Sequence, residues 1–258
     1  MNLINPSRKA LDEFQRMNLV SVNNNPIPWF EDHVGLKKIL FMNCAGLRPH
    51  FEDIRCDHRV SKADAIILLE TSLPTEDKDN AEELQLIGYE SSFIQVGKGK
   101  GIATYKKSKF VIDEEIKLPY YQIVKLKDLD IDVIGVYRSQ IGNSSNLLQD
   151  LRRLINLDRI TLIVGDINSC YIENKHSKLI QGLENLGFKQ LIHEPTHIRG
   201  RIIDHAYILD PKNLITINWE RYSPYYSDHD AFCLSIKMND DSTSSKETFD
   251  ALKSMMLQ

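Results

Sequence analysis

Polar side chains suited to cleaving a phosphodiester bond follow several apolar segments of this 258-residue chain. Each segment is typical of a β-strand, and strand ends present polar groups at the rim of a sheet. Any one of these residues alone is better explained as a solvated strand end or a turn residue, but so many together favour one shared site. The candidates are Asn43, Glu70, Asp166, Asn168, Asp204, Asp228 and His229.

Three of these residues offer oxygen atoms to a hard divalent cation. The carboxylates of Glu70 and Asp228 and the amide carbonyl of Asn43 suit Mg²⁺ or Mn²⁺. Because Mg²⁺ keeps several water ligands, one or two direct carboxylates are enough. We therefore expect a Mg²⁺ (or Mn²⁺) cofactor at these side chains.

The remaining candidates could act on the nucleophile and on the phosphate. Asp166 could orient or deprotonate the attacking water, and Asn168, two residues later, points to the same side of the strand end. His229 could donate a hydrogen bond to a phosphoryl oxygen while Asp204 fixes the tautomer of its ring. These residue types leave open which of them is the general base.

Apolar patterning predicts the elements that must position these residues. Strands are expected at residues 38–43, 65–70, 101–105, 121–126, 131–137, 161–166, 203–208, 214–219 and 231–237, and helices at 7–17, 145–156 and 174–186. Several strands are continuous apolar runs, as expected where both faces are covered. The pattern predicts an α/β fold, a four-layered sandwich with helices flanking two central, mixed and mostly antiparallel β-sheets.

Length and composition favour one domain at residues 35–237, after an N-terminal extension at 1–34 and before a polar linker or tail at 238–258. Hydrophobic residues make up 42% of the chain, enough for a core without disulfides or a structural metal. The four cysteines form no C-x-x-C pair, which favours free thiols in a reducing, intracellular compartment. No apolar run is long enough to cross a bilayer, so no membrane partner is expected.

The ordered motifs resemble those of the endonuclease/exonuclease/phosphatase superfamily. They are Met42–Leu47 (MNCAGL), Leu69–Thr71 (LET), Gly165–Asn168 (GDIN), Ile203–Asp204 and Ser227–His229 (SDH), with weaker matches at Gly99–Ala103 and Gly135–Tyr137. The resemblance spans about residues 39–236 and implies the sandwich fold and an active enzyme.

Residue by residue, the resemblance implies the following roles. Asn43 and Glu70 would hold the metal and the substrate phosphate, and Tyr137 would contact the phosphate. Asp166 and Asn168 would position the nucleophile. Asp204 would pair with His229, and Asp228 would complete the metal or water network. The departures from the family pattern are Ala45 in place of Asp or Asn, Ile167 in place of an aromatic residue, and Arg138 in place of a small one.

The segment from Glu194 to His205 (EPTHIRGRIIDH) resembles the endonuclease domains of mobile elements, both LINE-type and Helitron-type. This resemblance implies that the chain nicks DNA, leaving a 3′-hydroxyl and a 5′-phosphate, and that Thr196 helps to bind the DNA backbone. The polar ends of the chain, which look cut from a longer polypeptide, fit further domains of a parent polyprotein, and a DNA substrate implies action in the nucleus.

DNA binding needs a local basic patch, because the net charge of the chain is −4. The DNA-contacting candidates are Lys98, Lys100, Arg138, Arg199 and Arg201, together with Thr196. Lys98 and Lys100 belong to a group of lysines around one predicted hairpin, with Lys106, Lys107 and Lys109. A merely solvated hairpin explains these lysines as well.

Other interpretations of the chain remain open. The same fold could serve an RNA-directed nuclease such as a deadenylase, a phosphoesterase for small molecules, or a catalytically silent nucleic-acid-binding module. A metal pair of His193 and His197 is disfavoured because Pro195 stands between them and their spacing requires a helix. The cysteines at positions 44 and 170 and the tryptophans at positions 29 and 219 are expected to be packing residues.

Overall fold

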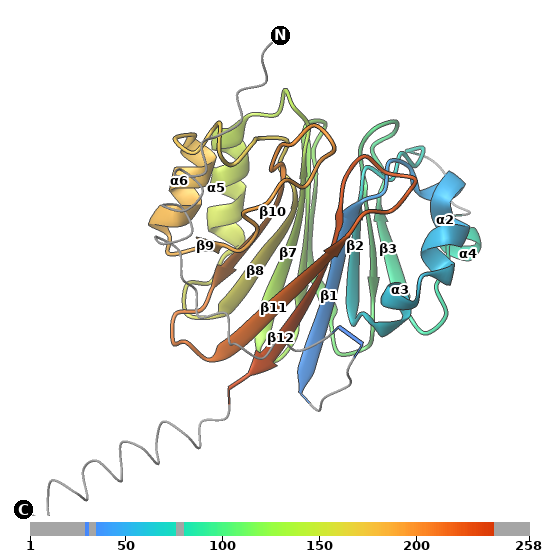
Figure 1. Ribbon diagram of the computed structural model, residues 1–258, viewed down its shortest axis with the longest axis horizontal. Coiled ribbons are helices and arrows are strands. Elements are labelled where there is room, and N and C mark those ends of the chain that lie inside the picture. Colours follow the sequence, from blue (N-terminus) through green and yellow to red (C-terminus); the bar gives the residue numbers. More distant parts are fainter. Residues whose placement is uncertain (1–28, 31–34, 76–79, 240–258) are drawn as a thin grey trace, which may run out of the picture.

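The computed structural model describes residues 29–30, 35–75 and 80–239, with the side chains of Asn80 and Ala81 left out. Within these residues the chain forms two six-stranded β-sheets that lie face to face, with helices on both outer sides (Figure 1). The expected α/β sandwich, with mixed and mostly antiparallel sheets, is confirmed.

The first sheet has the strand order β11-β12-β1-β2-β4-β3. Only β1 and β2 are parallel, and all other neighbours run antiparallel. Its strands are β1 (Leu36–Asn43), β2 (Ala65–Leu69), β3 (Glu90–Ile94), β4 (Ile102–Lys106), β11 (Ile215–Tyr222) and β12 (Ala231–Met238). Helices α2 (Leu47–Cys56) and α3 (His58–Lys62) connect the parallel pair, and α4 (Asn80–Glu83) precedes β3.

The second sheet has the order β5-β6-β7-β8-β10-β9 and follows the same plan. Its one parallel pair, β7 and β8, is connected by helix α5 (Ser144–Leu154). Its strands are β5 (Val111–Lys117), β6 (Tyr121–Lys127), β7 (Ile131–Arg138), β8 (Ile160–Asp166), β9 (Lys189–Gln190) and β10 (Asp204–Leu209). Helix α6 (Lys178–Asn185) packs beside α5 on the outer face.

Alternation along the strands of the first sheet separates two cores. On β1, Ile39 and Phe41 belong to the core between the sheets, whereas Leu40 and Met42 pack with α2 on the outer side. The sheets approach closely at Gly135 on β7, where a Cβ atom would stand 2.8 Å from the Ile67 side chain of β2. Burial on both faces explains why these strands are continuous apolar runs.

All nine predicted strands are present, with ends shifted by at most a few residues. The prediction missed β3, β5 and β9 and the helices α2, α3 and α4. Strand β5 (VIDEEIK) is rich in charge because it is an edge strand, and α2 carries Pro49 in its first turn, where proline is tolerated. The predicted helix at 174–186 is confirmed as the shorter α6, and the helix predicted at 7–17 lies outside the described residues.

Trp29 belongs to the folded domain although it lies in the expected N-terminal extension. Its side chain is 1% exposed, and its indole Nε1 donates to the Arg59 carbonyl (3.3 Å). All four cysteines are free, and Cys44 and Cys170 are buried, as expected. Among the described residues no helix has the length and apolar character needed to cross a membrane.

Candidate active site

The two parallel strand pairs bring the predicted site residues to one edge, the upper edge in Figure 1. Asn43, the last residue of β1, pairs with Leu69 of β2, and Glu70 follows Leu69 directly. In the other sheet, Tyr137 of β7 pairs with Asp166 at the end of β8. Asp204 begins β10 opposite Asp166. The carboxyl ends of parallel strands are where α/β sheets bind ligands.

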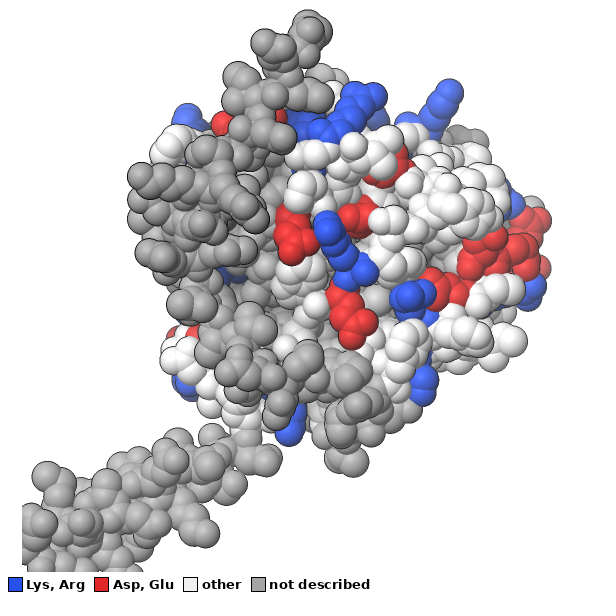
Figure 2. Space-filling view, viewed as in Figure 1, with Lys and Arg blue, Asp and Glu red and all other residues white. Residues whose placement is uncertain are grey.

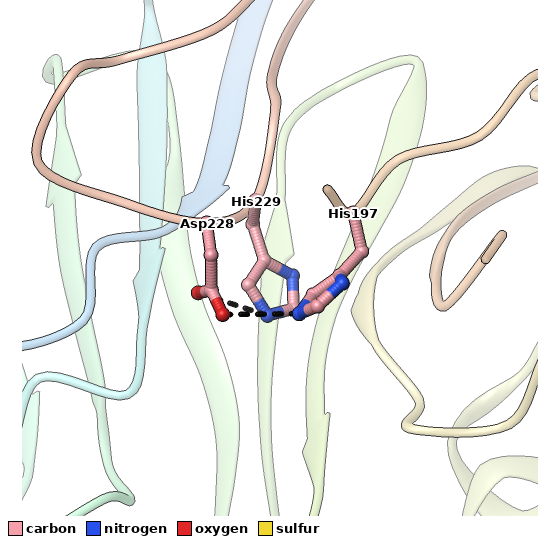
Figure 3. Close-up of side chains that lie close together, drawn as sticks. All are labelled: His197, Asp228 and His229. Atoms are coloured by element: carbon pink, nitrogen blue, oxygen red, sulfur yellow. Dashed lines mark hydrogen bonds and ion pairs between the residues drawn. The ribbon is translucent and has the colours of Figure 1, made fainter. Parts of the chain in front are cut away.

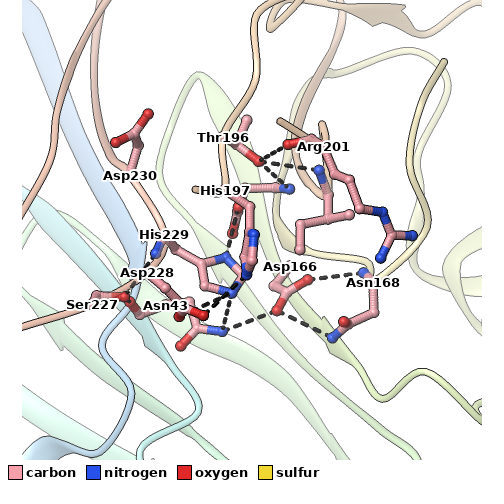
Figure 4. Close-up of polar contacts among 12 residues, drawn as sticks. Asn43, Asp166, Asn168, Thr196, His197, Arg201, Ser227, Asp228, His229 and Asp230 are labelled. Atoms are coloured by element: carbon pink, nitrogen blue, oxygen red, sulfur yellow. Dashed lines mark hydrogen bonds and ion pairs between the residues drawn. The ribbon is translucent and has the colours of Figure 1, made fainter. Parts of the chain in front are cut away.

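Asp166 lies at the centre of the site and is fully buried. Its Oδ2 accepts hydrogen bonds from Asn43 Nδ2 (3.0 Å) and Asn168 Nδ2 (3.2 Å), and its Oδ1 accepts from the Asn168 amide (2.8 Å) (Figure 4). Burial, followed by the charges of Asp204 and Glu70, raises the pKa of Asp166 well above its usual range, whereas His229 and the Asn168 amide lower it. Asn43 and Asn168 thus hold the carboxylate in one orientation.

Asp204 and His229 form a buried carboxylate–imidazole pair. The Nδ1–H of His229 donates to Asp204 Oδ2 (2.8 Å), which directs Nε2 toward Asn43, 3.3 Å from its Nδ2. Burial alone lowers the pKa of His229, but the hydrogen bond and charge of Asp204, with Asp166 and Asp228, raise it to about 9. A pKa of about 9 favours the protonated ring at neutral pH, in which Nε2–H is a donor and the 3.3 Å contact with Asn43 Nδ2 is not a hydrogen bond.

Glu70 and Tyr137 meet across the two sheets. Tyr137 Oη lies 2.9 Å from Glu70 Oε1 and 2.9 Å from the Gly99 carbonyl. Burial, with the charge of Glu70 and its hydrogen bond, raises the pKa of the Tyr137 phenol, so the hydroxyl stays protonated. The tyrosine therefore presents a neutral donor beside Glu70.

Backbone strain is concentrated at this edge. Ala45, Glu70, Ser72 and Asn168 have φ between 50° and 56°, and the only other non-glycine residue with positive φ in the described part of the chain is Asn213. Such conformations cost free energy and persist only where the surrounding structure enforces them. They turn the loops after β1, β2 and β8 so that polar side chains point into the site.

Thr196 and Ser227 brace the site from inside. The buried Thr196 Oγ1 accepts from the Ile203 and Asp204 amides (3.1 Å each) and lies 3.3 Å from the Arg201 carbonyl. Thr196 was expected to contact the DNA backbone, but its hydroxyl is buried. It instead holds the backbone at Ile203 and Asp204. Ser227 Oγ, which the predicted site set left out, donates to the Asn43 carbonyl (2.7 Å) and accepts from the His229 amide (3.1 Å).

Arg138 was expected at the DNA interface but lies inside the protein, 6% exposed. Its guanidinium donates to the carbonyls of Ile167 (2.8 Å), Gly142 (2.6 Å) and Asn168 (3.3 Å). Because two of these bonds reach carbonyls of the loop after β8 and the third reaches a carbonyl of the loop after β7, Arg138 ties the two loops together. Its guanidinium is buried and bonded to these carbonyls, so it is not presented to DNA.

The lysines that the sequence grouped around one hairpin are separated in the structure. Lys98 and Lys100 lie in the loop before β4, beside Gly99, whose carbonyl contacts Tyr137 at the site. Lys106 pairs in register with Ala65 at the opposite end of β2, and Lys109 forms an ion pair with Asp64 (2.7 Å). Figure 2 shows basic side chains at the upper edge and charges of both signs over the rest of this face.

The loop before β10 carries the remaining basic candidates. Arg199 is exposed, and Arg201 Nε lies 3.6 Å from a Glu173 carboxylate oxygen. The same loop carries His197, a residue that the predicted site set left out, and its ring contacts Asp228 and His229 (Figure 3). Its place directly after Thr196 was the only signal in the sequence.

Two groups of three potential ligands occur within the described residues: His197–Asp228–His229 and Asp166–Asp204–His229. Glu70 is in neither group, although its charge acts on both Asp166 and Tyr137. Asp204 Oδ1 is buried and accepts no hydrogen bond. The carboxylates of Asp166 and Asp204, with ligand atoms within 4.8 Å of one another, fit a hard divalent cation, because its charge relieves their mutual repulsion.

The architecture matches several solved structures. The endonuclease domain of TRAS1, a telomere-specific non-LTR retrotransposon, superposes with a TM-score of 0.60 at 14% identity, over 79% of this chain and 99% of that one. An AP endonuclease from Archaeoglobus fulgidus gives 0.58 at 18% identity, over 77% and 98%. This is the endonuclease/exonuclease/phosphatase fold.

The NExo 3′ phosphatase from Neisseria, solved with a product DNA hairpin, shares the endonuclease/exonuclease/phosphatase fold with a TM-score of 0.55 at 15% identity, over 79% of this chain and 99% of that one. No family model matches the sequence, and no curated protein matches it. Nucleases and a phosphatase both occur among these structures of the same fold.

Proposed function

We propose that this chain is a divalent-metal-dependent endonuclease that nicks DNA and leaves a 3′-hydroxyl and a 5′-phosphate. One observation carries the proposal: Asp166 is held by Asn43 and Asn168 beside the Asp204–His229 pair, at the edge where Glu70 and Tyr137 meet. This constellation contains a water-orienting carboxylate, a cationic donor and acidic oxygens for a metal.

The roles follow from the geometry of these side chains. Asp166 orients the attacking water, assisted by Asn168, and the charged His229 donates through Nε2 to a non-bridging phosphoryl oxygen. Tyr137, whose single hydroxyl proton faces Glu70 Oε1 and the Gly99 carbonyl, would turn this proton to the phosphate when the substrate binds. The attack forms a bond from the water oxygen to phosphorus and breaks the bond between phosphorus and the 3′ oxygen. The attacking water loses its proton to Asp166, and the 3′ oxygen takes a proton from solvent and leaves as a hydroxyl.

Glu70, Asn43 and Asp228 are the proposed metal ligands. A Mg²⁺ or Mn²⁺ ion bound there would supply positive charge to the phosphate in the transition state. Asn43 Oδ1 accepts from the Ala45 backbone amide (3.1 Å), and only one oxygen of Asp228 is hydrogen-bonded to His197.

DNA contacts are proposed for four cations near the site, the exposed Lys98 and Arg199 and the half-buried Lys100 and Arg201. The PTHIRGR segment, which resembles mobile-element endonucleases, and the superposition on the TRAS1 domain support an origin in a transposable element. Action in the nucleus, beside further domains of a parent polyprotein, belongs to the same proposal.

The test is nicking of supercoiled plasmid with Mg²⁺ and with EDTA. Wild type should form open circles only with the metal, and Asp166→Asn should be slower by about 10²–10⁴-fold because it loses the carboxylate that orients the water. Asp158→Asn, an exposed carboxylate outside the site, is the matched control and should behave as wild type. Undiminished cleavage by Asp166→Asn would refute the assigned mechanism.

Inactivity on plasmid would direct the search to other substrates of the same fold. Labelled poly(A) tests a deadenylase, which shortens it progressively from the 3′ end. Phosphorylated small molecules test a phosphoesterase. Metal-independent binding of DNA without cleavage of any substrate would identify a silent binding module.

A further inference from the structure

His197 contacts two residues of the site, although the proposed reaction assigns it no role. Its Nε2 lies 3.0 Å from Asp228 Oδ2, and its ring stands edge-on to the His229 ring, with centroids 4.8 Å apart and planes at 90° (Figure 3). Asp228 Oδ1 lies 3.9 Å from His229 Nε2. The side chains of His197, Asp228 and His229 therefore form one cluster.

The backbone fixes the tautomer of His197. Its Nδ1 accepts a hydrogen bond from the Arg199 amide (3.0 Å), so Nδ1 carries a lone pair and the proton is on Nε2. The Nε2–H then donates to Asp228 Oδ2. A ring in this tautomer has no lone pair at Nε2 for a metal, so His197 donates to Asp228 beside His229 and the three residues do not form a three-ligand metal centre.

Backbone hydrogen bonds also hold His197 beside the segment that carries Asp228 and His229. His197 and His229 form an isolated antiparallel bridge, in which the Ile198 amide donates to the Asp228 carbonyl (3.0 Å) and the Asp230 amide donates to the Thr196 carbonyl (2.8 Å). The Asp228 side chain is 49% exposed, and His197 is the residue that holds one of its oxygens by a hydrogen bond. Without this donor the carboxylate can rotate.

We propose that His197 is a positioning residue that fixes Asp228 with Oδ2 committed to Nε2–H and Oδ1 turned toward His229. The proposal rests on the proposed function, because it assigns Asp228 one free oxygen for the metal or water network. Partners that orient a metal-binding side chain are commonly worth 10–100-fold in metal affinity or activity.

The first test uses the metal-free protein and no substrate. Long-range ¹H–¹⁵N NMR should show His197 as the neutral Nε2–H tautomer, and its hydrogen-bonded Nε2–H signal should disappear in Asp228→Ala. An Nδ1–H tautomer, or a ring protonated on both nitrogens, would overturn the proposal. This result does not depend on whether the chain cleaves DNA.

The second test compares two variants at one position. His197→Leu removes the donor and should lower kcat for nicking by about 10–100-fold, raise the Mg²⁺ concentration for half-saturation and leave KM for DNA nearly unchanged. His197→Gln offers an amide donor near the place of Nε2 and should recover most of the loss. His176→Leu, at an exposed histidine outside the site, should behave as wild type.

Each other outcome has a definite meaning. Equal activity of His197→Leu and wild type would refute positioning, as would a rise in KM alone, which would mean a DNA contact. Stoichiometric binding of Zn²⁺ by calorimetry that requires His197, Asp228 and His229 would make His197 a ligand instead. If wild type shows the expected NMR signals but fails to nick DNA, the proposed DNA-nicking function is refuted, whereas the hydrogen bond from His197 to Asp228 is confirmed.

Discussion

At the scale of single residues, burial decides which protonation state of an ionisable side chain the fold contains. His205 follows Asp204 on β10 and is fully buried. Its Nε2–H donates to the Ser169 carbonyl (2.9 Å), next to Asn168, and its Nδ1 accepts from Tyr207 Oη (3.0 Å). Both partners suit a neutral ring, and burial lowers the pKa of His205 to about 4.

This neutral histidine makes the stability of the fold sensitive to acid. The unfolded chain binds a proton at a pKa near 6.5 and the folded chain only near 4, so stability is present above pH 6.5 and falls as the pH drops toward 4. The loss should reach about 2 kcal/mol at pH 5. Urea unfolding of wild type at pH 7.5 and pH 5 measures the total change.

His205→Gln isolates the contribution of this ring, because the amide can keep the bond to Ser169 without titrating. The drop in unfolding free energy between the two pH values should shrink by about 2 kcal/mol. His176→Gln, at an exposed histidine, should leave the drop unchanged. An equal drop in His205→Gln and wild type would show that His205 is not the group responsible.

At the scale of the elements, the parallel strand pairs position the site residues, and one glycine permits the close spacing of β7 and β8. Gly165 precedes Asp166 on β8 and has φ +146°. A Cβ atom there would stand 1.9 Å from the Val136 carbonyl oxygen of β7. Any side chain would push β8 away from β7, and Asp166 with it.

Gly165→Ala should therefore lower the free energy of unfolding by about 3 kcal/mol or more. Gly88→Ala is the matched control, because Gly88 also has positive φ (+83°) but its Cβ would meet no atom within 4 Å. The control should lose only the strain energy, about 1 kcal/mol. Denaturant titration compares the two, and similar losses would contradict the role of strand crowding.

At the scale of the whole molecule, the two ends of the sandwich differ in what their lysines do. Lys98 and Lys100 lie at the end that carries the site, whereas Lys107 and Lys109 lie at the other end and pair with Asp64 (3.6 and 2.7 Å). A net charge of −4 offers no general attraction to DNA. Affinity must therefore come from cations at the site end.

The double variant Lys98→Gln/Lys100→Gln should bind DNA more weakly, and the slope of log affinity against log salt should fall by about 2, since two phosphate contacts are lost. Lys107→Gln/Lys109→Gln removes the same charge from the other end and should change this slope little. Fluorescence anisotropy with a labelled duplex at several salt concentrations measures both. Equal slopes for the two variants would contradict a DNA face at the site end.

The sequence by itself determined the strands that carry the site and the chemical types at their ends. Buried strands are continuous apolar runs, so the ends of β1, β2 and β8 were readable, and with them Asn43, Glu70 and Asp166. The edge strands β3 and β5 were missed because they carry few apolar residues.

Only the tertiary structure decided what the loop residues do. Arg138 and Thr196 were expected to face DNA, but they satisfy buried backbone groups. His197 meets Asp228 through a bridge between segments about thirty residues apart, and Lys98 and Lys109 lie at opposite ends of one sheet. Apolar periodicity is a local property, whereas the partner of a polar side chain is set by strand pairing far along the chain, so no local pattern contains it.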